Sequence, residues 1–214
     1  MIKLFGVFEH SKRANGSEQV IRAGKWIASG FPTPAPNIVK WKVLERWGGR
    51  NTWIETGTYL GETTKHLSTI SEKLISIEPE KKLFENALSK FKNYTNVTII
   101  NGTSEGELGL VISSLNEKEI HDISFWLDGH YSAGITYLGA EETPVNTELK
   151  TIGENLNRIN IITIFVDDCR QFAKSDDPDN SYPTLSSLVS YANLHHLYWI
   201  IEHDIFIMTN RNQL

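Results

Sequence analysis

The sequence predicts an α/β fold, a doubly wound sheet of seven strands that is mostly parallel and closes with an antiparallel hairpin. Three observations support this prediction. Five short apolar runs alternate with segments of helical length, as in a parallel sheet with crossover helices. The last two apolar runs are separated by only two residues, which is too short for a parallel crossover. The first fifty residues lack this alternation, so we expect an N-terminal helical extension over residues 1–50 and the sheet domain over residues 51–214.

Two helices are expected in the extension. The first has Ser17 as its N-cap and Gly30 as its terminator. Residues 31–36 contain three prolines and therefore form a connector, because proline lacks the backbone donor that a helix or central strand needs. The second helix is expected over Asn37–Trp47, where apolar residues recur every three positions until a glycine pair begins at Gly48.

Seven strands are expected from the apolar runs. In chain order they are Thr52–Glu55, Leu74–Glu78, Val97–Asn101, Ile123–Asp128, Ile161–Asp168, Leu197–Glu202 and Ile205–Thr209. The final pair is joined by His203 and Asp204 alone, so these two strands must be antiparallel.

Composition bounds the class of protein. The chain has 214 residues, with 21 Lys and Arg against 26 Asp and Glu, a net charge of −5, which fits a single globular domain without the basic surface that nucleic acids or anionic membranes require. Cys169 is the only cysteine, which excludes an internal disulfide or a CxxC zinc site and predicts a cytoplasmic location. Neither a signal peptide nor a membrane-spanning segment is expected, because no apolar run approaches about 18 residues.

A glycine turn follows the first expected strand. The segment reads Trp53-Ile-Glu55-Thr-Gly57-Thr-Tyr-Leu-Gly61-Glu-Thr63 and leads into a helix. Glycines let a ligand approach the backbone closely, and the helix N-terminus presents free N–H groups. Glu55 should repel a pyrophosphate and attract a positive group, so the turn favours a sulfonium amino acid over NAD. The alternative is that the glycines serve packing only.

The next two strands end in polar side chains. Glu78 ends the second strand, where a carboxylate can bind both hydroxyls of a ribose. Thr103 and Ser104 follow the third strand, where they can contact an adenine edge or only cap the next helix.

An acidic cluster is expected where the fourth and fifth strands end. Asp128 and His130 follow the fourth strand, and Asp167 and Asp168 end the fifth. Carboxyl ends of adjacent parallel strands lie together, and oxygen ligands suit Mg²⁺, Mn²⁺ or Ca²⁺. Neighbouring strand residues point to opposite faces, so both aspartates reach one ion only if the strand has already turned. The alternative is that one aspartate caps the next helix and the other packs against the turn.

Together these residues resemble the class I S-adenosylmethionine (SAM)-dependent methyltransferases over Thr52 to Thr209. The resemblance is strongest to the metal-dependent O-methyltransferases of the macrocin and cephalosporin-hydroxylase-like types. It implies a Rossmann-like, SAM-binding domain over residues 51–214 and a divalent ion, Mg²⁺ above all, that chelates neighbouring oxygens of the acceptor. The implied metal ligands are Asp128, Asp167 and Asp168. The implied cofactor-binding residues are Glu55, Gly57, Thr58, Tyr59, Gly61, Thr63, Glu78, Thr103, Ser104 and Asp128.

The expected function is therefore metal-assisted, SAM-dependent O-methylation of a small molecule or sugar in carbohydrate or secondary-metabolite biosynthesis. Asp128 and His130 are the expected catalytic residues, with His130 taking the hydroxyl proton because imidazole has an ordinary pKa of about 6.5. His130 could instead be a turn residue bonded to backbone. The expected partner is the acceptor and neither nucleic acid nor membrane, and a homo-oligomer is possible. The alternatives are a non-catalytic SAM- or nucleotide-binding partner protein and a metal-dependent hydrolase.

Overall fold

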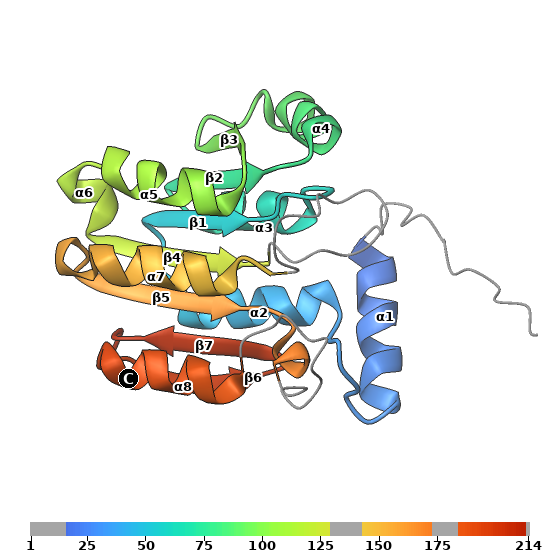
Figure 1. Ribbon diagram of the computed structural model, residues 1–214. Coiled ribbons are helices and arrows are strands. Elements are labelled where there is room, and N and C mark those ends of the chain that lie inside the picture. The colour runs from blue at the N-terminus through green and yellow to red at the C-terminus, as the bar shows by residue number, and fades with distance from the viewer. Residues whose placement is uncertain (1–15, 129–142, 173–183, 213–214) are drawn as a thin grey trace, which may run out of the picture.

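The computed structural model describes residues 16–128, 143–172 and 184–212, and it consists of one sheet with helices on both faces (Figure 1). The strands are β1 (Thr52–Thr56), β2 (Lys73–Glu78), β3 (Val97–Asn101), β4 (Asp122–Leu127), β5 (Ile161–Val166), β6 (Tyr198–Glu202) and β7 (Ile205–Thr209). The helices are α1 (Gly16–Ala28), α2 (Asn37–Trp47), α3 (Glu62–Ile70), α4 (Lys81–Phe91), α5 (Ser104–Ser114), α6 (Glu117–Ile120), α7 (Val145–Asn155) and α8 (Leu185–Leu194), with short 3-10 turns η1 (Leu156–Arg158) and η2 (Cys169–Gln171).

The sheet confirms the predicted fold class. Its strand order is β3-β2-β1-β4-β5-β7-β6, and β7 runs antiparallel to both β5 and β6 while the other pairings are parallel. The closing hairpin turns through His203 and Asp204, which have φ of 50° and 72°. Two left-handed residues in succession are what a tight turn between twisted antiparallel strands requires.

Two apolar layers hold the helices to the sheet. On one face, α5, α7 and α8 bury side chains such as Leu108, Leu149 and Leu188 against the strands. On the other face, Leu44 of α2 and Leu67 of α3 pack with the strand residues that point that way. Because successive strand residues alternate between faces, this two-sided burial explains the continuous apolar runs of β1, β4 and β5.

Several element boundaries differ from the sequence-based prediction. Four strands differ by one residue: β1 ends at Thr56, β2 begins at Lys73, β4 runs from Asp122 to Leu127, and β6 begins at Tyr198. The differences at α1 and β5 are larger. Helix α1 begins at Gly16 rather than after Ser17, and it ends at Ala28, ahead of the left-handed Gly30. Strand β5 ends at Val166, so Asp167 and Asp168 lie beyond the strand rather than within it. The reason is that Asp168 adopts a left-handed conformation with φ of 56°, which an extended strand cannot contain.

The N-terminal helices lie against the sheet domain in different ways. Helix α2 packs on one face and contributes Val43 and Leu44 to its core. Helix α1 stands at the side toward which β1, β4 and β5 point (Figure 1), and Trp26 contacts the His203 ring of the closing hairpin at 5.3 Å between centroids. The extension therefore reaches the carboxyl edge of the parallel strands.

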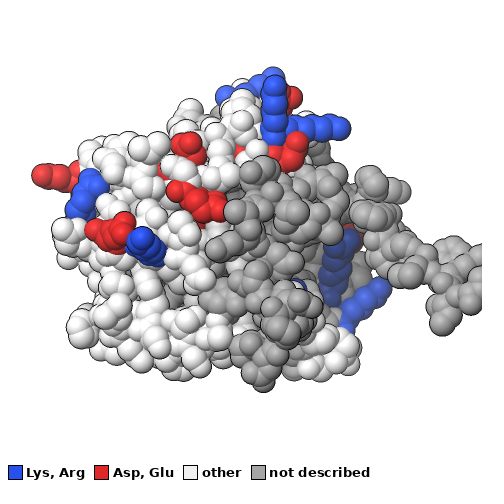
Figure 2. Space-filling view, in the orientation of Figure 1, with Lys and Arg blue, Asp and Glu red and all other residues white. Residues whose placement is uncertain are grey.

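The surface carries scattered charges of both signs on the described residues of the face shown in Figure 2. The outer strand β6 exposes a row of apolar side chains from Tyr198 to Ile201. A homo-oligomer stays a prediction. Within the described ranges, none of the helices combines the length and apolar character needed to cross a bilayer.

Candidate functional site

The glycine turn lies at the carboxyl edge of the sheet, between β1 and α3. Gly57 has φ of 87° and donates its N–H to the carbonyl of Ile77 in β2 at 3.0 Å. Gly61 has φ of 68°, precedes α3 as its N-cap, and donates to the carbonyl of Thr58 at 2.8 Å. A Cβ added to Gly61 would lie 2.7 Å from Cε2 of Phe91. Both glycines are therefore required by the path of the backbone, and the first-turn N–H groups of α3 face the edge without intrahelical acceptors.

Glu55 is placed beneath this turn rather than at its surface. Its carboxylate is 1% exposed and accepts hydrogen bonds from Thr64 of α3 and Ser76 of β2, both at 2.6 Å. Thr58 continues this network through a 2.6 Å hydrogen bond to Ser76. Burial raises the pKa of Glu55 to about 8, although the hydrogen bonds from the two hydroxyls lower it in part. Glu55 therefore lies buried under the turn, and the expectation that it attracts a cationic group stays a prediction.

Glu78 connects the turn to the end of β2. Its Oε2 accepts the backbone N–H of Tyr59 at 2.7 Å, and its Oε1 accepts that of Glu80 at 2.9 Å. Burial raises its pKa, and the two backbone donors oppose the rise. A carboxylate has about four acceptor positions. Glu78 therefore retains capacity for the two ribose hydroxyls that the sequence assigned to it.

Thr103 and Ser104 lie where β3 passes into α5. The Thr103 hydroxyl accepts the backbone N–H of Gly106 at 3.3 Å and so caps α5, and its contact with an adenine edge stays a prediction. Ser104 is buried at the first position of the helix and lies beside Glu148 of α7. Thr63 is half-buried in the first turn of α3.

Glu148 is a buried carboxylate that the sequence analysis missed. It is 0% exposed, and neither of its oxygens has a hydrogen-bond partner of good geometry in the described structure. Burial raises its pKa to about 7, although the hydroxyls of Ser104 and Thr56 lie close enough to oppose the rise. The signal was present in the sequence, because Glu148 lies three residues after Val145 and four before Ile152 on the buried stripe of α7.

The acidic cluster forms where β4 and β5 end side by side. Asp128 follows β4 and donates its backbone N–H to Thr56, and the N–H of Asp167 is bonded to Leu127. The left-handed turn at Asp168 removes the geometric objection to two adjacent aspartates, since both now reach one group. The Asp168 carboxylate makes no cap hydrogen bond to η2, so the capping alternative is not supported.

The group that they reach is Lys40 of α2, a residue the sequence analysis did not select. Its Nζ lies 2.5 Å from Oδ2 of Asp167 and 3.5 Å from Oδ1 of Asp168. Burial opposes the charged form of Lys40, but the charges of Asp167, Asp128 and Asp168 raise its pKa. Burial and the charge of Asp128 raise the pKa of Asp167 as well. Both directions favour a proton held between Lys40 and Asp167.

Arg170 fixes the segment after the cluster. Its guanidinium bonds Oδ1 of Asp168 at 2.7 Å and also pairs with the carboxylate of Asp204 in the closing hairpin. The backbone N–H of Arg170 donates to the same Asp204 side chain at 2.8 Å. The hairpin therefore holds the two aspartates after β5 in place. His130 lies outside the described residues.

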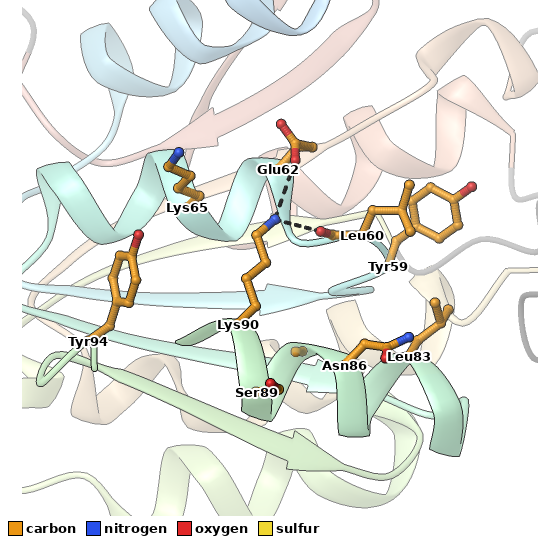
Figure 3. Close-up of a pocket in the computed structure, with 10 residues that line it drawn as sticks. Tyr59, Leu60, Glu62, Lys65, Leu83, Asn86, Ser89, Lys90 and Tyr94 are labelled. Carbon is orange, nitrogen blue, oxygen red and sulfur yellow. Dashed lines mark hydrogen bonds and ion pairs between the residues drawn. The ribbon is translucent and has the colours of Figure 1, made fainter. Parts of the chain in front are cut away.

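A separate hollow of about 710 Å³ lies between α3 and α4 (Figure 3). Of the predicted cofactor-binding residues, only Tyr59 lines it. Lys90 crosses from α4 and donates its Nζ to the carbonyls of Leu60 and Gly61 at 2.7 and 2.8 Å. This hollow thus backs onto the glycine turn, and Lys90 braces the turn from that side.

Solved structures with similar architecture were found. The O-methyltransferase TomG from Streptomyces achromogenes, in complex with SAM, has a TM-score of 0.54, 13% identity, and coverage of 95% of this chain and 91% of its own. An O-methyltransferase from Bacillus cereus, in complex with S-adenosylhomocysteine (SAH), has a TM-score of 0.54, 16% identity and coverage of 91% and 90%. The chain has the class I methyltransferase fold. No family model and no curated protein sequence matches it.

The residues at the carboxyl edge of this methyltransferase fold suit a polar ligand of the SAM type. Glu78 keeps free acceptor positions at this edge, and the hydroxyl of Thr56 and both oxygens of Glu148, which lie close to one another, make no hydrogen bond of good geometry in the part of the chain described. Unpaired buried polar atoms are costly unless a ligand, water or proton satisfies them. The acceptor oxygens of Glu78 therefore fit a ligand that carries hydroxyl donors.

The same edge does not fit a resident divalent ion. Lys40 Nζ occupies the position beside Asp167 that such an ion would take, because metal–oxygen distances are about 2.0–2.6 Å. Among the residues described, no group of three or more His, Cys, Asp or Glu side chains is arranged to hold a metal. Asp167 and Asp168 instead pair with the ammonium of Lys40, and Asp128 affects it by charge.

Proposed function

We propose that this protein is a SAM-dependent O-methyltransferase that acts on a hydroxyl group of a small molecule or sugar. One observation carries the proposal: the backbone N–H of Tyr59 in the glycine turn donates to Glu78. This contact lies at the same edge of the sheet as Asp128 and Ser104. The methyltransferase fold supports it, since ligands of doubly wound sheets bind outside the carboxyl ends of the strands.

Bound SAM would supply an activated methyl group on sulfur. In this assignment Gly57 lets the amino-acid end approach the backbone, Gly61 gives the turn the left-handed φ of 68° that it needs, and the N-terminus of α3 offers donors to the carboxylate of the ligand. Glu78 accepts hydrogen bonds from the ribose hydroxyls. Ser104 lies on the side assigned to the adenine, with Glu148 behind it.

Methyl transfer to oxygen is an in-line displacement, so the protein must hold the acceptor hydroxyl in line with the methyl group and remove its proton. Asp128 lies at the end of β4, next to the turn, where it can orient the acceptor. His130, two residues further on, is the proposed base. Metal assistance is not assigned to this step, because the cluster of Asp128, Asp167 and Asp168 already contains Lys40.

A methyl-transfer assay tests the proposal. Wild-type protein is incubated with methyl-labelled SAM and a panel of hydroxylated sugars and phenols, and SAH release is measured. We expect SAH release that depends on one class of hydroxylated acceptor and falls at least about 100-fold in Asp128→Asn. The exposed Glu154→Gln on α7 serves as a control that keeps wild-type turnover.

The outcomes separate the rival functions. SAM binding without turnover on any acceptor would favour a non-catalytic SAM-binding protein. Phosphatase or esterase turnover without SAM would favour a hydrolase. Acceptor-dependent SAH release supports the methyltransferase.

A further inference from the structure

The cation among the three aspartates comes from the N-terminal extension. Lys40 lies on α2, 127 residues before Asp167 in the chain, yet its side chain is only 12% exposed and that of Asp167 only 4%. The ammonium contacts both aspartates that follow β5, and Asp128 at the end of the neighbouring β4 attracts it by charge. The ammonium of Lys40 therefore lies among carboxylates from the ends of two strands, where a bound metal ion would otherwise lie.

Helix α2 is anchored so that this lysine has a defined position. Trp47 donates its indole N–H to Glu202 at 2.8 Å, and Arg46 pairs with the same carboxylate at 2.6 Å. The carbonyl of Trp47 accepts the hydroxyl of Thr163 in β5 at 3.0 Å. Helix α2 is thus bonded to the sheet at its far end, while Val43 and Leu44 are buried beneath it.

The ammonium and a divalent ion exclude each other here. Either would bind Oδ2 of Asp167 at short range, and two cations at one place repel each other strongly in a buried setting. A lysine also differs from a metal in chemistry: it has three N–H donors and no vacant coordination positions. It can hold one oxygen of an acceptor, but it cannot chelate two.

We propose that Lys40 replaces the divalent ion in this protein, so that the acidic cluster is metal-independent and the acceptor is held by a hydrogen bond rather than by chelation. The part of this proposal that concerns the acceptor rests on the proposed methyl transfer. It extends the substrate class to acceptors with an isolated hydroxyl, without a neighbouring oxygen. The part that concerns the metal stands on the Lys40 contacts alone.

The test is a Mn²⁺ titration of the full chain after dialysis against EDTA, followed by calorimetry and thermal unfolding. We expect no saturable binding by the wild type below about 1 mM Mn²⁺. Lys40→Ala should bind Mn²⁺ at least about tenfold more tightly and show a Tm that rises with Mn²⁺ concentration, because Asp167 loses its paired cation and Asp128 the nearby charge, while Arg170 still pairs with Asp168. Lys42→Ala, an exposed lysine on the same helix, should behave as wild type.

Two results would overturn the proposal. One is saturable Mn²⁺ binding by the wild type that Asp167→Asn removes. The other is the absence of Mn²⁺ binding in both wild type and Lys40→Ala, since the carboxylates would then not form a cation site. Should Lys40→Ala fail to fold, Lys40→Met keeps the aliphatic stem and takes its place in the comparison.

The titration needs neither SAM nor acceptor, so its outcome is independent of the proposed methyl transfer. In a preparation that is active, excess EDTA should leave turnover unchanged, and an acceptor with one isolated hydroxyl should be methylated. If the wild type bound neither Mn²⁺ nor SAM and Lys40→Ala bound Mn²⁺, the proposal for Lys40 would stand and the proposed methyl transfer would be rejected.

Discussion

Tyr59 and Glu78 join the glycine turn to the second strand: the backbone N–H of Tyr59 lies 2.7 Å from Oε2 of Glu78. Tyr59 itself has φ of 48°, so this hydrogen bond accompanies a backbone conformation that non-glycine residues adopt only rarely. In the proposed function the Glu78 carboxylate thus accepts hydrogen bonds both from the turn backbone and from the ribose hydroxyls.

Glu78→Gln should weaken SAH binding roughly 10- to 100-fold, because the amide replaces one acceptor oxygen by a donor and hydrogen bonds to charged groups contribute about 1.5–3 kcal/mol. Isothermal titration with SAH measures the change. Glu85→Gln, an exposed position on α4, is the matched control and should bind as wild type. Equal affinity in the Glu78 variant would remove this residue from the site.

Gly61→Ala should destabilise the fold by about 1–3 kcal/mol and weaken SAH binding with it. An alanine at this position must adopt the φ of 68°, which costs an L-residue about 1–2 kcal/mol. In addition, its Cβ would lie 2.7 Å from the Phe91 ring. Urea unfolding gives the stability. Gly24→Ala is the control, because this helical glycine has open space around it and alanine should be neutral or slightly stabilising. A Gly61 variant as stable as wild type would show that the turn tolerates a side chain.

Glu148→Gln should change how stability depends on pH. In the folded chain this carboxyl keeps its proton up to about pH 7, whereas unfolding returns it to an ordinary value of 4.5. The folded state therefore binds the extra proton between these values, and wild-type stability should fall relative to Glu148→Gln as pH rises from about 4.5 to 7. The difference should reach about 1–3 kcal/mol and stay constant at higher pH.

Urea unfolding of the two proteins at a series of pH values measures this difference. Glu154→Gln, on the exposed side of the same helix, should follow the wild-type curve. Parallel curves for wild type and Glu148→Gln would mean that the buried carboxyl is satisfied and ionised in the folded chain.

The central strands were predictable because burial on both faces of the sheet leaves continuous apolar runs in the sequence. The runs over Val97–Asn101 and Ile205–Thr209 match β3 and β7 at both ends, and α2 matches Asn37–Trp47. The end of β5 was misplaced by two residues, since nothing local in Asp167-Asp168 specifies a left-handed backbone at the second aspartate.

The site was predictable only in part, because its missing members depend on tertiary contacts. Lys40 lies four residues before Leu44 and three before Val43, which puts it on the buried stripe of α2, but its partner is 127 residues away. Glu148 is hidden on α7 in the same way. Charged residues on the apolar stripe of a helix are the signal that would have found both. The buried position of Glu55 could not be predicted for a related reason, since the hydroxyls that bond it come from Thr64 and Ser76, on two other elements.

Calorimetric titration of SAH into wild-type protein and into Gly57→Val tests the central claim, that the glycine turn between β1 and α3 holds the adenosyl amino acid. We predict saturable one-to-one binding by the wild type, and none by Gly57→Val in a chain whose circular dichroism shows it folded, because the side chain would fill the space beside the backbone at φ of 87°. No heat of binding with the wild type, or equal affinity in the folded variant, would contradict the account.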